Sequence, residues 1–70
     1  MKTIKLTDDE IDRMIYVLGN STSDPGTLIA LCPSLKEVNA CIKGENKLRT
    51  ALSRETIKEW TKEDFEGANS

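Results

Sequence analysis

Histidine is absent from this sequence, and aromatic residues are reduced to one Trp, one Tyr and one Phe among 70 residues. Without histidine the chain lacks the commonest general acid–base group. It also contains no glycine-rich phosphate loop, no G-x-S-x-G motif and no H-E-x-x-H motif. A chain this short builds few clefts in which several polar groups converge. The sequence therefore predicts a protein that is not an enzyme and that uses no cofactor.

Cysteine and long apolar runs are equally scarce. Cys32 and Cys41 are the only cysteines, whereas a zinc site normally uses four ligands arranged in close pairs, so no metal site is predicted. No apolar signal segment follows Met1, and no apolar run approaches the roughly 20 residues of a membrane span. We therefore expect a cytoplasmic protein that does not enter membranes and keeps both thiols free.

Neither sign of charge dominates, because ten basic and twelve acidic residues leave a net charge of −2. General affinity for nucleic acid needs a clearer basic excess. Below roughly 70–80 residues a single core rarely contributes more than about 3–5 kcal/mol, so small proteins often recruit partner subunits. We expect one helical domain over residues 1–66 and a disordered tail over residues 67–70.

Helix start signals are the clearest local features. Thr7 and Glu10 form a capping box, and apolar residues then recur at helical spacing until a Gly-Asn pair follows. This pattern predicts a helix over residues 7–18 and a loop over residues 20–23. An Asp-Pro pair then starts a short apolar helical turn over residues 27–31.

A second capping box at Ser34 opens the longest predicted helix, which is expected to run from residue 34 to about residue 53. Its apolar seam should pack antiparallel against the seam of the first helix. The expected contacts join Ile11, Met14, Ile15 and Leu18 to Val38, Ile42, Leu48 and Leu52. Ser53 and Thr56 could cap a third helix, and Thr61 one further turn.

The predicted fold class is therefore all-α, as a small antiparallel helical hairpin or a three-helix arrangement with a bent linker. The linker adds more apolar surface than one hairpin needs, so a homo-oligomer is expected. Partner-binding anchors are expected among exposed apolar residues, although Trp60 and Phe65 could instead fold back over the hairpin. These candidates are Leu28, Ile29, Leu31, Trp60 and Phe65.

Two charged features stand out in and after the long helix. Five cations fall near the side opposite the apolar seam, and they could hold the phosphates of a nucleic acid or nucleotide, or simply form a solvated face. They are Lys36, Lys43, Lys47, Arg54 and Lys58. Glu45 stands inside the seam, four residues before Arg49. Either the seam is partly exposed there, or the pair fixes the register between two subunits.

Two resemblances follow from these segments. Residues 6–11 (LTDDEI), the Val-Leu-Gly at 17–19 and residues 47–52 (KLRTAL) resemble a helix-turn-helix of the sigma-factor type, although the connection after residue 19 is longer than that motif uses. The whole chain resembles the small helical-hairpin proteins that bacteriophages encode. That second resemblance implies a protein of the host cytoplasm that inhibits host or defence proteins or sequesters small signalling molecules.

The function predicted from the sequence is thus a non-catalytic protein-binding protein, with a phage inhibitor of a host or anti-phage defence protein as its specific form. Two alternatives stay open: a nucleic-acid binder that uses the basic helix face, and a nucleotide sponge with cations lining a pocket between subunits.

Overall fold

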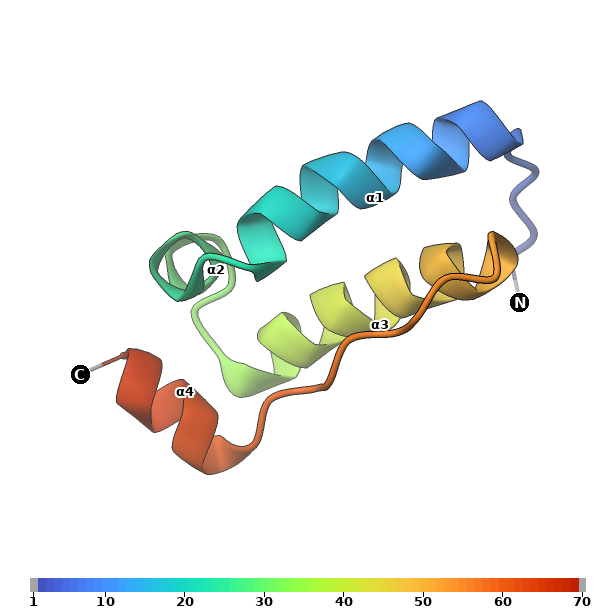
Figure 1. Cartoon of the computed structure of the whole chain (residues 1–70). Coiled ribbons are helices and arrows are strands. Elements are labelled where there is room, and N and C mark those ends of the chain that lie inside the picture. The colour runs from blue at the N-terminus through green and yellow to red at the C-terminus, as the bar shows by residue number, and fades with distance from the viewer. Residues whose placement is uncertain (1, 70) are drawn as a thin grey trace.

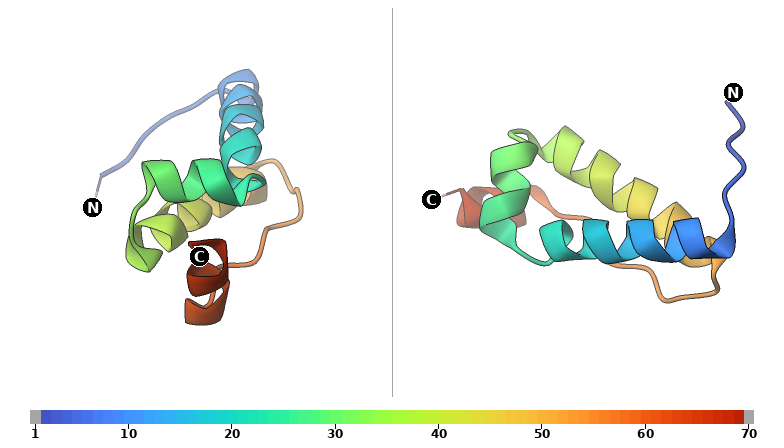
Figure 2. Two further views of the ribbon diagram at one scale, coloured as in Figure 1. Left: turned by 90° about the vertical axis from the view of Figure 1, so that its left-hand side faces the viewer. Right: turned by 90° about the horizontal axis from the view of Figure 1, so that it is seen from above.

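The computed structural model describes residues 2–69 and contains four helices. They are α1 (Asp8–Thr22), α2 (Pro25–Leu31), α3 (Leu35–Ala51) and α4 (Lys62–Ala68), and there is no strand among the described residues. The predicted all-α fold class is confirmed. The long helices α1 and α3 run in opposite directions, and they contact each other more extensively than any other pair of helices does (Figure 1). The short helix α2 crosses between them at one end of the pair, and α4 lies near it (Figure 2).

The helix starts follow the predicted local chemistry. The Thr7 Oγ1 accepts from the backbone N–H of Glu10 at 3.1 Å, and the Glu10 carboxylate accepts from the Thr7 N–H at 2.8 Å. At α3 only half of the predicted capping box forms, because the Ser34 hydroxyl accepts from the Glu37 N–H at 3.2 Å. A full capping box between Thr61 and Asp64 begins α4. These side chains satisfy backbone donors that no carbonyl of the same helix can reach.

The first helix is longer than predicted. It continues to Thr22, so residues 20–22 are helical and do not form a loop. The reason is a contact with another helix, because the Thr22 hydroxyl donates a 2.7 Å hydrogen bond to the Glu45 carboxylate of α3. The tertiary contact outweighs the local stop signal of the Gly-Asn pair.

Residues 54–61 form no helix, which corrects the third helix predicted at Ser53. The turn after α3 has the hydrogen bonds of a Schellman motif, with Ser53 N–H donating to the Thr50 carbonyl and Arg54 N–H to the Arg49 carbonyl. Ser53 adopts a φ of +57°, the left-handed conformation that ends a right-handed helix. The chain then runs extended back along α3 and enters α4 (Figure 1). We call residues 54–69 the arm.

The last helix includes part of the segment for which a disordered tail is predicted. Gly67 and Ala68 belong to α4, and Asn69 is its C-cap. Residue 70 lies outside the described residues.

The core is small and takes its side chains from α1, α2, α3 and the arm. Leu28 of α2 packs with Val38 and Ile42 of α3, and each side chain is at most 1% exposed. Ile11 and Ile15 of α1 are buried as well, whereas Met14 is 42% exposed and so lies largely outside the core in which it is expected. Half-buried side chains complete the cluster: Cys32, Cys41, Ile57, Trp60 and Phe65. The two long helices therefore do not form a core alone, because α2 and the arm cover it.

Replacing Ser53 with glycine should stabilise the protein. A side chain in the left-handed region destabilises the folded state by roughly 1 kcal/mol, which glycine avoids. Glycine also raises the entropy of the unfolded chain, which offsets roughly half of that stabilisation. The expected rise in the melting temperature is about 2–4 °C. The matched control is Ser23→Gly, because Ser23 has an ordinary φ of −85°. Thermal unfolding followed by circular dichroism should show a rise for the first variant and a small fall for the second.

Acid should destabilise the fold through its capping carboxylates. Hydrogen bonds from the Thr7 and Thr61 backbones hold the pKa values of Glu10 and Asp64 below their ordinary values of 4.5 and 3.8. A lowered folded-state pKa adds stability above the ordinary value, and this stability is lost as the pH falls through the folded-state pKa.

Melting temperatures measured between about pH 6 and about pH 2 should therefore fall less for Glu10→Gln than for the parent protein, because the amide can still accept the bond without titrating. Glu66→Gln, at an exposed glutamate outside any cap, should follow the parent curve. Parallel curves for all three proteins would contradict this assignment.

Candidate protein-binding surface

One flank of α1 carries apolar side chains that no other described segment covers. Val17 is 65% exposed and Met14 is 42% exposed, while the neighbouring Leu18 is half-buried. Together with Arg13 these three residues line a shallow hollow of about 360 Å³. A second hollow of about 430 Å³ adjoins it, since it shares Arg13 and Met14 and reaches Leu6. We call Leu6, Met14, Val17 and Leu18 the α1 strip.

The α1 strip has an acidic end. Asp9 and Glu10 line the second hollow beside Leu6, and Asp8 belongs to the same first turn of α1. The helix dipole favours carboxylates at this end of α1. An apolar surface next to three acids is complementary to a partner that presents apolar side chains beside basic ones.

Most of the predicted docking residues are buried or half-buried in the structure. Leu28 is 1% exposed, which makes it a core residue, and Trp60 and Phe65 are half-buried against the core. Ile29 is half-buried too, and only Leu31 among the five is well exposed, at 67%. Sequence reasoning instead placed the strip's Met14 and Leu18 in the core, because the periodic pattern alone does not say how wide a face one neighbouring helix can cover.

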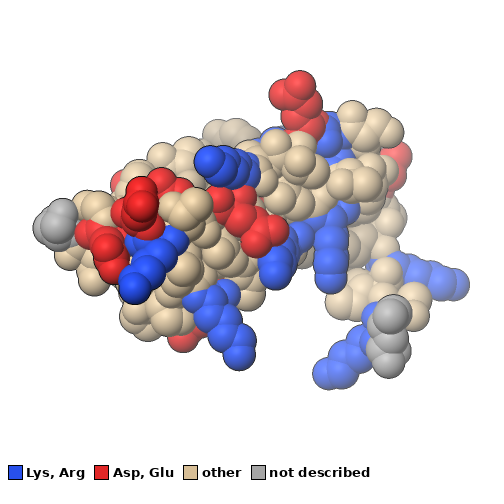
Figure 3. All heavy atoms as spheres, turned by 90° about the horizontal axis from the view of Figure 1, so that it is seen from below, with Lys and Arg blue, Asp and Glu red and all other residues tan. Residues whose placement is uncertain are grey.

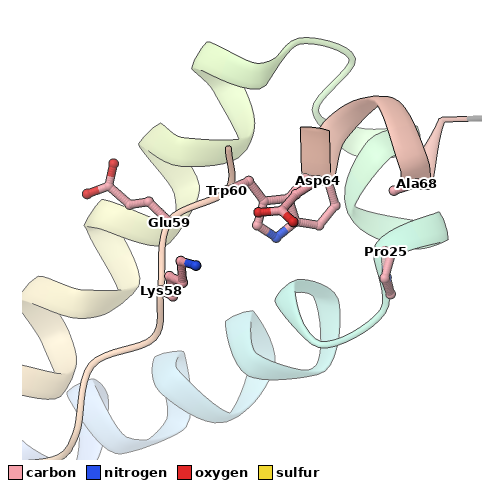
Figure 4. Close-up of a pocket in the computed structure, with 6 residues that line it drawn as sticks. All are labelled: Pro25, Lys58, Glu59, Trp60, Asp64 and Ala68. Atoms are coloured by element: carbon pink, nitrogen blue, oxygen red, sulfur yellow. The ribbon is translucent and has the colours of Figure 1, made fainter. Parts of the chain in front are cut away.

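The indole of Trp60 borders an open hollow of about 410 Å³ between the arm and α2 (Figure 4). Its other lining residues are Pro25, Lys58, Glu59, Asp64 and Ala68. One ammonium and two carboxylates around a half-buried indole make a mixed surface with no convergent set of donors or acceptors. The hollow therefore indicates no ligand class.

Two asparagines of α3 hold the arm, and sequence reasoning did not find them. The Asn46 side chain accepts from the Ile57 N–H and donates to the Ile57 carbonyl, both at 2.8 Å. The Asn39 side chain accepts from the Trp60 N–H at 2.8 Å and donates to the Trp60 carbonyl at 3.0 Å. Each amide thus forms the pair of bonds that a neighbouring strand would form with the extended chain. We call Asn39 and Asn46 the asparagine clamp.

The clamp matches the geometry of helix and arm. Asn39 and Asn46 are seven residues apart, which is about 10.5 Å along a helix and two turns, so they share one face. Ile57 and Trp60 are three residues apart, or about 10 Å in an extended chain. The signal in the sequence was therefore a pair of asparagines at a spacing of seven, on the edge of the apolar seam.

Glu45 is the one charged residue among the buried side chains that the structure describes, and it has no exposed surface. Its Oε1 accepts from the Thr22 hydroxyl, and its Oε2 accepts from Nε and Nη2 of Arg49, all at 2.7 Å. The partly exposed seam that the sequence allowed is corrected here, because Glu45 is fully buried and its carboxylate binds Thr22 and Arg49 of the same chain. The pair fixes α1 against α3 within one molecule.

The five predicted phosphate-binding cations do not form one face. Since α3 ends at Ala51, Arg54 and Lys58 belong to the arm and not to the helix. Lys43 lies 3.9 Å from the Glu59 carboxylate, and Arg54 lies 2.6 Å from that of Asp12. Lys36 and Lys47 are exposed. On the side seen in Figure 3, acidic and basic side chains are intermingled, so the surface offers no continuous positive patch there.

Three arginines instead meet in a hollow of about 400 Å³ between α1 and α3: Arg13, Arg49 and Arg54. Each of these guanidinium groups is paired with a carboxylate of the same chain, although two of them share one carboxylate. Arg54 and Arg13 both bind Asp12, and these hydrogen bonds lower the pKa of the Asp12 carboxyl. Arg49 binds Glu45. The hollow is consequently an ion-pair network that tethers the start of the arm to α1.

The two cysteines lie beside the core. Cys32 and Cys41 are free and half-buried beside the core, and burial, followed by the nearby Cys32 and Glu45, raises the pKa of the Cys41 thiol. A raised pKa keeps the thiol protonated and weakly nucleophilic at neutral pH. Among residues 2–69 there is no group of three potential metal ligands. Over the same residues, no helix combines the length and the apolar character that crossing a membrane requires.

Removing the Glu45 carboxylate should be among the most damaging single changes. Glu45→Ala leaves Arg49 and the Thr22 hydroxyl without their buried acceptor, and breaking a buried pair typically costs about 3–5 kcal/mol. The lower end applies here because the Arg49 side chain is 23% exposed and can bind water. Chemical denaturation should show a loss of about 3 kcal/mol. Glu66→Ala, which removes one partner of an exposed pair, should change the unfolding free energy by less than about 0.5 kcal/mol, and equal effects of the two would refute the central role of Glu45.

Comparisons with protein-family models, with curated proteins and with solved structures found no match to this chain, so its function is inferred from its own residues.

Proposed function

We propose that this is a non-catalytic protein-binding protein and that the α1 strip is its docking surface. The observation that carries the proposal is the exposure of Met14 and Val17 on a flank of α1 next to its buried side. Large apolar side chains that adjoin one another at the surface are typical of protein interaction sites. Val17 lies at one end of this surface and Leu6 at the other, so the strip follows α1 for most of its length.

The chemistry of the strip defines the kind of partner. Its apolar part fits a hydrophobic helix face or an apolar pocket, and Asp9 and Glu10 favour basic side chains at one end. Arg13 lines both hollows and lies 5.3 Å from the Tyr16 ring, so a stacked pair borders the strip. A partner with a basic amphipathic helix is the form that best matches these features.

A protein of this kind acts by covering a surface of its partner. Its resemblance to small phage-encoded helical proteins supports the more specific proposal of an inhibitor of a host or anti-phage defence protein. The intermingled charges around Lys43 and Arg54 give no comparable support to binding of nucleic acid.

Site-specific photo-cross-linking tests the proposal. A photoreactive phenylalanine analogue at position 17 should give one discrete adduct with a different protein when the chain is expressed in its native cells. The matched control carries the same analogue at position 50, where Thr50 is an exposed residue near the end of α3. The adduct should form from position 17 and not from position 50.

The captured partner should then bind Val17→Asp at least roughly tenfold more weakly than the parent, because a charge would be buried in an apolar contact. Val17 is exposed, so the melting temperature of this variant should stay close to that of the parent. Equal adducts from both positions, adducts only with the chain itself, or unchanged affinity of Val17→Asp would each argue against the α1 strip as the docking surface.

A further inference from the structure

The arm is held by contacts that would be the same whichever molecule supplied it. The asparagine clamp binds only the backbone of Ile57 and Trp60, through four hydrogen bonds of 2.8–3.0 Å. Between residues 54 and 61 the chain is extended and lies in neither a helix nor a strand. This part of the arm is therefore bound as an extended peptide is bound by a receptor.

Side chains of the arm complete the binding. Ile57, Trp60 and Phe65 pack against the core cluster, which includes the fully buried Val38 and Ile42 of α3. Lys43 of α3 adds an ion pair with Glu59 at 3.9 Å. Along one side of α3 the chain thus carries a groove with two backbone-binding amides and apolar contacts for residues spaced three apart.

The connection between groove and arm is strained. Ser53 adopts its left-handed conformation, with a φ of +57°, only because the chain must reverse direction directly after α3. A serine there is less stable than in an extended conformation, in which the arm would continue away from its own α3. Opening this hinge would separate the ion pair between Arg54 and Asp12 within one chain, and the same pair could form again between two chains that exchange their arms.

We propose that the groove of α3 is a peptide-binding site whose ligand is the arm of a second copy of this chain, so that two molecules exchange residues 54–69. Every clamp and core contact of the arm is then kept, and Ser53 of each chain leaves its strained conformation. Because the same contacts form in the monomer and in the arm-exchanged dimer, the conformation of the hinge and the protein concentration determine which form is favoured. None of the α1 strip residues takes part, so the exchange is independent of the proposed function.

Zero-length cross-linking of isotope-mixed protein tests the exchange. Unlabelled and ¹⁵N-labelled full-length chains are unfolded together in equal amounts, refolded at high concentration and separated by size, and a carbodiimide then joins nearby amines and carboxylates. In an arm-exchanged dimer, about half of the Lys43–Glu59 cross-linked peptides should combine a labelled and an unlabelled half. The monomer fraction should give none of these mixed peptides.

The protein supplies its own internal control. Lys62 and Glu66 lie 4.0 Å apart within α4, so their cross-linked peptide joins residues of one helix in either form. It should remain unmixed in the monomer and in the dimer. Mixing at this second pair would mean that random contact between molecules produces the signal, and it would overturn the assignment.

Variants at the hinge give a second readout. Ser53→Gly removes the strain and should weaken dimer formation by at least roughly tenfold, whereas Ser53→Val, which tolerates the left-handed region poorly, should strengthen it by a similar factor. The glycine variant keeps the proposal testable if the valine variant does not fold. A dimer with only unmixed Lys43–Glu59 peptides, or a parent protein that stays monomeric after refolding at high concentration, would overturn the proposal.

Discussion

The fold depends on one buried charge. Glu45 has no exposed surface, and its carboxylate is tolerated because Thr22 and Arg49 supply three donors at 2.7 Å. An unpaired carboxylate in this place would cost several kcal/mol, so other registers of α1 against α3 are disfavoured. The same contact extends α1 past its local stop signal. A Cβ at Gly19 would meet Arg49 Nη2 at 3.7 Å and Glu45 Oε2 at 3.9 Å, so α1 passes close beside the pair.

Because Glu45 occupies buried space between α1 and α3, fewer apolar residues fit there, and the arm supplies additional apolar side chains to the core. Leu28, Val38 and Ile42 make up the buried cluster, so Trp60 and Phe65 of the arm contribute a large share of the remaining apolar cover. The clamp makes this cover specific, because backbone bonds at two points set the register of the extended chain. The small core of this protein is therefore closed by a segment that is attached through side-chain amides.

The sequence predicted those features that depend on neighbours within a few residues. Capping boxes at Thr7 and Thr61 place the starts of α1 and α4 because their donors and acceptors are three residues apart. The end of α1 and the path of the arm depend on contacts 21–23 residues away, with Glu45 and Asn39, and no local pattern encodes them. Residues 57 and 60 fit helical spacing equally well, and the amides of Asn39 and Asn46 favour the extended form.

The candidate site was hard to predict for a related reason. The sequence marks Met14 and Leu18 as apolar residues at helical spacing, but it does not say that α3 covers only the side of α1 that holds Ile11 and Ile15. A hairpin of two helices would not need Leu28 in its core, whereas in the structure Leu28 of α2 belongs to the buried core cluster. Once α2 and the arm occupy α3, no described element is left to cover Val17. The exposure of the α1 strip thus follows from how the other elements of a short chain are used.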